Sequence, residues 1–274
     1  MALIDKLVAK PIIQAFGGGR QSTAILILIA QEKLPRPDHI VMANTSREAT
    51  STWDYMERYS LPLMQSLGLD FHLAPHSLAR RDMYNDKGKP AIPAFTRAGK
   101  LRMSVCSGEW KRDVMQRYLK KMGYGPKRHV TVWIGYSLDE ITRVKPSLRK
   151  WCEHAFPLVG LNMPSDYRHL RLRAGECRRI VQEFGWPDPP RSSCWMCPHR
   201  TNEEWVFLKE NYPLDWEKAV KLEREMNEHD LRSEGLFLHR QRVPLNTVDF
   251  SELDANNELD LPGLESCASG YCFV

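Results

Sequence analysis

The sequence predicts an α/β protein built on a parallel, Rossmann-like sheet, with a smaller, cysteine-rich and mainly helical C-terminal region. Short apolar segments alternate with longer segments of helical periodicity, and a glycine-rich segment follows the first of the short ones. After about residue 150, prolines and cysteines become frequent. Alternation of this kind implies parallel strands joined by right-handed crossovers. We expect residues 1–150 to form the α/β domain and residues 151–274 to complete its site.

The composition is that of an ordinary globular protein. Of 274 residues, 42% are hydrophobic and 27% are charged, and the net charge of +5 is a mild excess. The first residues include Asp5, and no apolar run approaches the roughly 18 residues that a membrane span needs. We therefore expect a cytoplasmic protein with no membrane partner. In that compartment the seven cysteines indicate metal binding, catalysis or packing before disulfides.

The first half of the chain supplies three strands and two helices. Residues 12–16 are typical of a short buried strand, and the apolar run 22–30 is typical of a helix. A second strand, 40–43, is followed by a segment with helical spacing, 51–67, and 71–73 is a candidate third strand.

The next part holds the clearest strand. Residues 75–100 are rich in Pro, Gly, Lys and Arg, which predicts a mobile loop. A helix is expected over 108–122 and a strand over 130–134, where β-branched and aromatic residues precede Gly135. One amphipathic helix is expected near 215–229.

Three predicted strands end just before a polar or glycine-rich segment, at Phe16, Ala43 and Ile134. Ligands of parallel sheets bind beyond the carboxyl ends of the strands, so these segments should share one crevice. The expected nucleotide-binding residues are Gly17, Gly18, Gly19, Arg20, Gln21, Ser22, Thr23, Asn44, Thr45 and Gly135.

The glycine-rich turn is suited to phosphate. Without side chains, backbone N–H groups can approach an anion at the start of a helix, whose dipole adds positive charge. Ser22 and Thr23 can donate further hydrogen bonds, and Arg20 can neutralise phosphate. The turn is neither a Walker loop nor the dinucleotide fingerprint. The alternative to phosphate binding is a tight turn that connects strand and helix and holds no ligand.

This turn resembles the PP-loop of N-type ATP pyrophosphatases and phosphoadenosine-phosphosulfate (PAPS) reductases, Ser-Gly-Gly-x-Asp-Ser. Gly17 stands in place of the family's Ser, and Gln21 in place of its Asp. Three more elements are similar to those of the PAPS reductase-like family: Cys106-x4-Lys111, the segment 135–147, and Cys194-x-x-Cys197-Pro. The resemblance implies a PP-loop (HUP-type) fold that binds ATP, or PAPS or its dephospho relative APS, with Mg²⁺. If the family's Asp helps hold Mg²⁺, Gln21 leaves the metal's placement open.

Charged residues follow the strand that ends at Ile134. The carboxylates of Asp139 and Glu140 can position Mg²⁺, while Arg143 and Lys145 can meet phosphates. The resemblance adds weight to Arg143 and Lys145 and gives Lys111 a catalytic role. The alternative is a solvated charged turn.

The cysteine spacing predicts a metal centre. Cys194 and Cys197 can reach one metal from a tight turn, and the resemblance makes Cys106 the third ligand. Cys177 is the expected fourth ligand, with Cys152 as its competitor. Four thiolates hold either Zn²⁺ or a [4Fe–4S] cluster, and the resemblance favours the cluster. Unlinked thiols and a redox dithiol are the alternatives.

The tail carries Cys267 and Cys272. Sulfonucleotide reductases have their catalytic cysteine on a mobile C-terminal tail, so the resemblance makes Cys272 a candidate nucleophile. A frayed terminus is the alternative.

Three functions follow from these observations. The first is ATP-dependent adenylation and sulfur transfer, with nucleic acid as a candidate acceptor that the basic segments 87–112 and 169–173 would contact. The second is sulfonucleotide reduction through Cys272. The third is a zinc-stabilised module that binds a nucleotide or nucleic acid without catalysis, for which Gln21 is the best argument.

Overall fold

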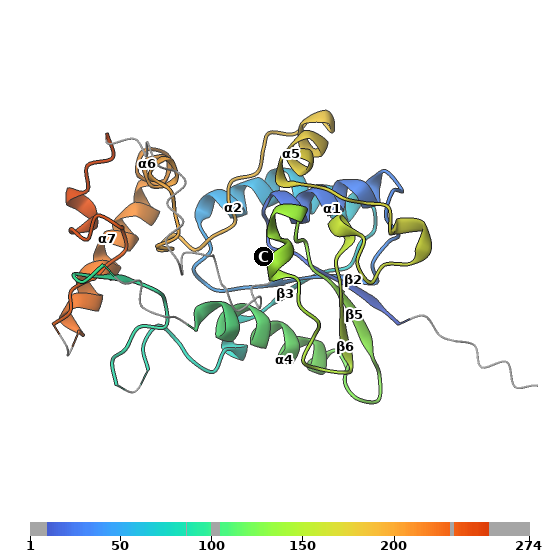
Figure 1. Ribbon diagram of the computed structural model, residues 1–274, viewed down its shortest axis with the longest axis horizontal. Coiled ribbons are helices and arrows are strands. Elements are labelled where there is room, and N and C mark those ends of the chain that lie inside the picture. Colours follow the sequence, from blue (N-terminus) through green and yellow to red (C-terminus); the bar gives the residue numbers. More distant parts are fainter. Residues whose placement is uncertain (1–9, 86, 100–104, 231–232, 252–274) are drawn as a thin grey trace, which may run out of the picture.

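The computed structural model describes residues 10–85, 87–99, 105–230 and 233–251. Its centre is a parallel sheet of five strands in the order β3-β2-β1-β5-β6 (Figure 1). The strands are β1 Ile12–Ala15, β2 His39–Ala43, β3 Phe71–Ala74, β5 Val130–Trp133 and β6 Cys152–Ala155. The predicted α/β class and its parallel sheet are confirmed. The sequence missed only β6 among these strands.

The strand order explains where a ligand can bind. From β1 the chain adds β2 and then β3 on one side, and it later returns to add β5 and β6 on the other side. Neighbouring crossovers therefore leave the sheet in opposite directions at the carboxyl ends of β1 and β5, which opens a crevice there. The glycine turn follows β1 at this point.

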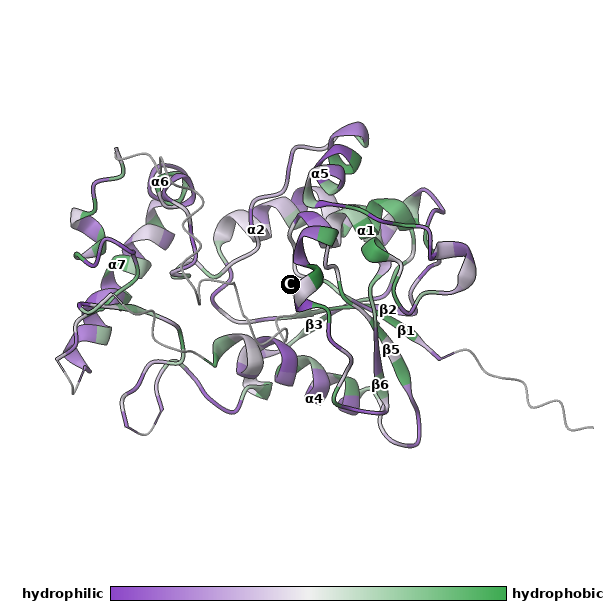
Figure 2. Ribbon diagram, viewed as in Figure 1, coloured by the Kyte–Doolittle hydropathy of each residue, from purple (hydrophilic) through white to green (hydrophobic). Residues whose placement is uncertain are grey.

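Helices cover both faces of the sheet. On one face α1 (Arg20–Ala30) lies beneath α5 (Ala174–Glu183), and on the other lies α4 (Asp113–Lys121). Because α1 is covered by both the sheet and α5, it is apolar nearly all round (Figure 2). A π-helical turn, η3 (Ser107–Arg112), leads into α4.

The helix expected over 51–67 is present in three parts. These are α2 (Thr50–Tyr55), a π-helical turn η1 (Met56–Ser60) and α3 (Leu61–Ser66). Short 3₁₀ turns complete the chain: η2 His76–Leu78, η4 Leu138–Arg143, η5 Pro157–Val159, η6 Ser165–Tyr167 and η7 Leu245–Thr247.

A second lobe is built from α6 (Asn202–Asn211), α7 (Pro213–Glu228) and a two-stranded antiparallel ribbon, β4 (Phe95–Thr96) with β7 (Leu236–Phe237). The prediction of a loop over 75–100 was therefore wrong for its second half. Residues such as Ile92 and Phe95 are buried, and Ile92 packs in an apolar cluster with the second lobe. The partner strand lies far along the chain, so the local composition did not reveal it.

The expected boundary at residue 150 falls inside the α/β layer. Strand β6 belongs to the main sheet, and α5 packs on α1. The second lobe therefore takes its helices from the chain after α5. Its ribbon takes β4 from the part before residue 150 and β7 from the part after it. No helix in the described part of the chain is both long and apolar enough to cross a membrane.

Candidate functional site

The glycine turn brings open backbone donors to the carboxyl end of β1. Gly18 has a φ of +76°, a left-handed conformation that favours glycine, and Gly19 is the N-cap of α1. No side chain caps this helix, and its first turn holds no acidic residue. The first N–H groups of a helix have no intrahelical acceptor, so this end is suited to an anion.

A cavity of about 430 Å³ lies in front of the turn and is lined by both lobes. Its lining includes Gly19, Arg20, Gln21, Thr45, Cys106, Trp110, Lys111, Glu140, Arg143, Arg191, Ser192, Cys194, Cys197 and His199. The structure thus brings four motifs that are distant in sequence to one place. The other predicted site residues among those described do not line this cavity.

The segment that carries the paired cysteines is docked on the glycine turn. The hydroxyl of Ser192 lies within hydrogen-bonding distance of two acceptors, the carbonyl of Gly17 and Oε1 of Glu48, the latter at 3.1 Å. Ser193 and Trp195 pair with the backbone just after β2, through Ala49 N–H to Ser193 O and Trp195 N–H to Arg47 O, both at 3.0 Å. Both Ser192 and Ser193 are buried. The sequence offered no local signal for this contact.

Arg20 already has a carboxylate partner. Its guanidinium donates two hydrogen bonds to Asp188, at 2.7 and 2.5 Å, and the hydrogen bond to Asp188 raises the pKa of Arg20. In this conformation Arg20 links the start of α1 to the segment after α5. The sequence led us to expect that Arg20 would contact phosphate, whereas its partner here is Asp188.

Lys111 is the central cation of the cavity. It lies on η3 near a buried carboxylate, Glu48, and the three cysteines Cys106, Cys194 and Cys197. Burial lowers the pKa of Lys111, but Glu48 and the three sulfur groups raise it more, so the pKa is raised overall and the ammonium stays charged. Sequence reasoning missed Glu48, because its position after β2 matched no motif.

Cys194 and Cys197 lie in a tight turn, closed by Cys197 N–H donating to Cys194 O at 3.0 Å. Burial raises the pKa of Cys194 to about 12, while Thr45 Oγ1 lies 3.6 Å from its sulfur. Together with Cys106, the pair lines the cavity. The described residues contain one three-ligand group whose atoms all lie within 4.8 Å of one another, and it lies elsewhere.

Cys177 is not brought to the other cysteines. It is fully buried on α5 against Ile25 and Leu28 of α1, and burial raises its pKa to about 12. It therefore acts as a small apolar side chain, and its assignment as fourth ligand is corrected. Its competitor Cys152 is also a core residue, on β6. Cys267 and Cys272 lie outside the described residues.

The two carboxylates after β5 have different surroundings. Asp139 accepts hydrogen bonds from Ala174 N–H at 2.6 Å and from Arg173 at 3.3 Å, so it holds the start of α5, and it does not line the cavity. Glu140 lines the cavity, accepts a hydrogen bond from Gln21 Nε2 at 3.1 Å and pairs with Arg143.

The cations of this segment also differ. The guanidinium of Arg143 lies over the ring of Tyr136, 4.5 Å from its centroid, at the cavity wall. Lys145 lies outside the cavity. In the basic run 169–173, Arg171 donates to three backbone carbonyls. Its Nη1 is therefore bonded to the protein's own backbone, while the residue remains exposed.

Several predicted residues support the turn without lining the cavity. A side chain at Gly135 would lie 3.3 Å from Ile25, so glycine lets β5 end close to α1. Ser22 donates to Gly19 O at 2.9 Å, and Thr23 is fully buried. Asn44 accepts from Ser46 N–H at 2.7 Å and closes the turn after β2.

No family model and no curated protein matches this chain. It is similar to two solved structures, each at 12% identity and a TM-score of 0.43. One is the phosphoadenylyl-sulfate (PAPS) reductase of Candida auris in a phosphate complex, with 69% of this chain and 84% of that chain covered. The other is the U34-tRNA thiolase NcsA of Methanococcus maripaludis with its [4Fe–4S] cluster, with 80% and 72% covered. By its four motifs, gathered at the carboxyl edge of a parallel sheet, the chain resembles the PAPS reductase-like group of the PP-loop superfamily.

Proposed function

We propose that this protein is a PP-loop-type enzyme that adenylates an acceptor with ATP and then transfers sulfur to it. One observation carries the proposal: the glycine turn and the three cysteines line the same cavity, with Lys111 near the cysteines. A nucleotide whose phosphates bind the turn would thus have its reacting phosphorus close to the sulfur chemistry.

The phosphates would bind at the uncapped start of α1. Lys111 and Arg143 line the cavity and supply positive charge against the phosphate oxygens. Glu140 is the candidate ligand for Mg²⁺, because its carboxylate lies beside Gln21, where the PP-loop pattern has an aspartate. Glu140, in the segment after β5, would thus supply the carboxylate that the PP-loop pattern has at the position of Gln21.

Three cysteines at one cavity can hold an iron–sulfur cluster, which the resemblance to PAPS reductase-like proteins favours over a single zinc ion. Tetrahedral zinc with Zn–S bonds of about 2.3 Å holds its sulfurs about 3.8 Å apart. A [4Fe–4S] cluster, with one thiolate on each iron, holds its sulfurs farther apart than that. Cys106, Cys194 and Cys197 would hold the cluster, which supplies a site for binding sulfide or a persulfide next to the nucleotide.

The reaction runs in two substitutions. An acceptor oxygen attacks the α-phosphorus of ATP, a new P–O bond forms, and pyrophosphate leaves with the electrons of the broken P–O bond. A sulfur nucleophile then attacks the activated carbon and displaces AMP. The residues of this chain hold the phosphates, stabilise the charge on pyrophosphate and keep water from the adenylate.

A second cavity, of about 460 Å³, supports nucleic acid as the acceptor class. It shares Pro190, Arg191 and Glu204 with the first cavity. Its lining combines four aromatic rings, three arginines and four carboxylates: Tyr55, Tyr59, Phe207, Tyr212, Arg58, Arg191, Arg200, Asp54, Asp188, Glu203 and Glu204. Aromatic faces stack on bases, so an unpaired base is the part of a single-stranded nucleic acid that this cavity would hold. The phosphates would have to lie beside the arginines and away from the four carboxylates.

The test combines cluster content with ATP turnover. Protein purified without oxygen should contain iron and sulfide and release pyrophosphate from ATP when an acceptor nucleic acid is present. Cys194→Ala and Cys197→Ala should lose the iron, whereas Cys177→Ala should keep it. Stoichiometric zinc without iron, or equal iron in all variants, would contradict the proposal.

Cys272 separates this proposal from sulfonucleotide reduction. If the tail thiol attacks the sulfur of PAPS or APS, Cys272→Ser should abolish sulfite release from those nucleotides. Sulfur transfer with ATP should survive the same change. Sulfite production that depends on Cys272 would favour the reductase.

A further inference from the structure

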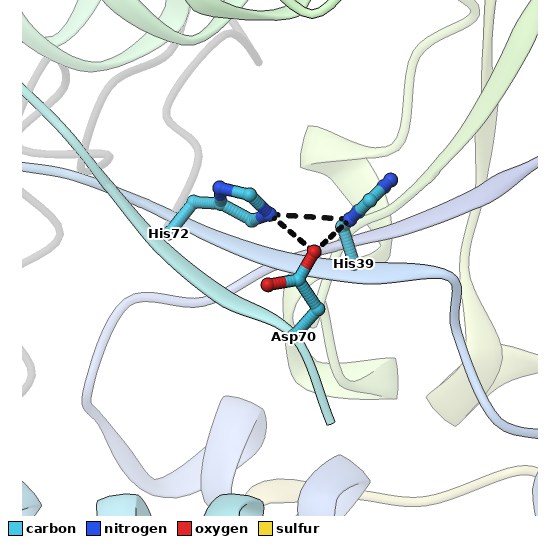
Figure 3. Close-up of side chains that lie close together, drawn as sticks. All are labelled: His39, Asp70 and His72. Carbon is cyan, nitrogen blue, oxygen red and sulfur yellow. Dashed lines mark hydrogen bonds and ion pairs between the residues drawn. The ribbon is translucent and has the colours of Figure 1, made fainter. Parts of the chain in front are cut away.

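We propose a second metal site, specific for a zinc-like divalent ion, at the amino end of strands β2 and β3. Its ligands are His39 Nδ1, His72 Nε2 and one carboxylate oxygen of Asp70, which all lie within 4.8 Å of one another (Figure 3). The sheet edge that carries this trio is opposite to the edge where the glycine turn follows β1. The proposal is therefore independent of the proposed function.

Strand pairing brings the trio together. β2 and β3 are parallel, with Ile40 opposite Phe71 and Val41 opposite His72. His39 therefore stands opposite Asp70, and alternate residues of a strand point to the same face. The three side chains must share one face of two neighbouring strands, so the backbone places the ligands before any ion binds.

The contacts within the trio are better satisfied by a cation than by protons. Asp70 Oδ2 lies 2.7 Å from His39 Nδ1 and 2.8 Å from His72 Nε2, while the two nitrogens are 3.1 Å apart. If both rings donate to the carboxylate, no acceptor is left for the contact between the nitrogens. One cation at the centre would be coordinated by the lone pairs of His39 Nδ1, His72 Nε2 and Asp70 Oδ2 together.

The distances suit a small tetrahedral ion. With Zn–N bonds of about 2.0–2.1 Å, tetrahedral geometry holds two ligand nitrogens about 3.3 Å apart. The observed separations of 2.7–3.1 Å reach that value with shifts of a few tenths of an ångström. Two imidazoles and a carboxylate are typical ligands of zinc, and the exposed side of Asp70 leaves a fourth position for water.

An outer partner already orients one ligand. The second ring nitrogen of His72, Nδ1, lies 3.1 Å from the hydroxyl of Tyr118 on α4. Metal-binding histidines commonly use their other nitrogen in this way, which sets the ring's orientation. An ion here would join the edge strand β3 to β2 and, through Tyr118, to α4, so its first role would be to stabilise this corner of the domain.

The experiment uses Co²⁺ as an optical probe on the full chain. A site of nitrogen and oxygen ligands gives weak visible bands without the intense thiolate-to-cobalt transition that the cysteines would give. We expect one equivalent of Co²⁺ to bind with these weak bands and without the thiolate transition. His72→Gln and Asp70→Asn should weaken its binding at least tenfold, and His129→Gln, an exposed histidine outside the trio, should leave it unchanged.

Tyr118→Phe provides the finer test, because it keeps all three ligands. Loss of an outer partner typically weakens metal binding about tenfold or more. Zn²⁺ should also raise the melting temperature of the native protein, and Asp70→Asn should remove that increase while its circular dichroism stays native. The proposal is overturned if the native protein binds no Co²⁺ outside the cysteines. It is also overturned if the Asp70→Asn variant binds that Co²⁺ as tightly as the native protein does.

Discussion

Gly18 and Gly19 are neighbours with different structural requirements. Gly18 has the left-handed φ of +76°, and a Cβ there would lie 2.7 Å from Thr52 Cγ2 and 3.0 Å from Met56 Sδ. Gly19 has an ordinary φ of −98°, and the nearest atom to a Cβ there would be Ser192 Cβ, at 3.1 Å. Gly18 is thus required by the fold itself, so replacing it would disturb more than phosphate binding.

We expect Gly18→Ala to lower the free energy of unfolding by at least about 2 kcal/mol, because left-handed strain adds to overpacking. Gly19→Ala should cost clearly less and act mainly on nucleotide affinity. Urea denaturation of both variants, with ATP binding measured on the folded protein, checks this. Equal destabilisation by the two changes would refute the distinction.

At the scale of elements, the second lobe is held by buried polar groups as well as apolar packing. His239 lies after β7 and contacts the Asn202 side chain at the start of α6, with Nε2 2.8 Å from Oδ1. Its Nδ1 accepts a hydrogen bond from Gln241 N–H at 3.3 Å. These partners suit the neutral ring with its proton on Nε2. Burial and the nearby Arg240 lower the pKa of His239 to about 4.

This shift predicts a pH dependence of stability. The unfolded chain takes up a proton at His239 below about pH 6.5, whereas the folded chain does so only near pH 4, so stability falls as pH drops through that window. The loss from this residue is about 3 kcal/mol at most. His239→Gln should reduce the slope of the unfolding free energy against pH between pH 6.5 and pH 4.

The control for this prediction is His169→Gln, which changes an exposed histidine. Its pH profile should match that of the native protein. If His239→Gln shows the native slope, the buried ring does not supply the pH dependence. Denaturant titrations at several pH values give the slopes.

At the scale of the whole molecule, one cavity joins the two lobes. The segment 189–199 supplies one wall, and the start of α1 supplies another. Hydrogen bonds from this segment, which leads into α6, to Gly17 and to the residues after β2 fix it to the α/β domain. A ligand that touches both walls should therefore stabilise both lobes together.

We expect Mg·ATP to raise the free energy of unfolding by about 2.7 kcal/mol at a hundred times its Kd. Hydrogen exchange should slow in residues 17–23 and in residues 189–197, because both segments contribute to the cavity in which we propose that the nucleotide binds. Adenosine, which lacks phosphates, is the control and should protect neither segment. Protection confined to one lobe would place the nucleotide elsewhere.

The sequence by itself determined the elements whose signals are local. Alternating strand and helix patterns gave the parallel sheet, three glycines gave the turn after β1, and Cys194-x-x-Cys197 gave the tight turn. These features depend on periodicity, backbone freedom and spacing, which a short window of sequence contains.

Only the tertiary structure decided which side chains meet. It paired β4 with β7, docked Ser192 on Gly17, placed Asp188 on Arg20 and buried Cys177 in the core. It also gathered His39, Asp70 and His72, which no motif had marked. Each contact joins segments whose own composition allows many partners, so its outcome depends on strand order, register and packing, which only the folded chain specifies.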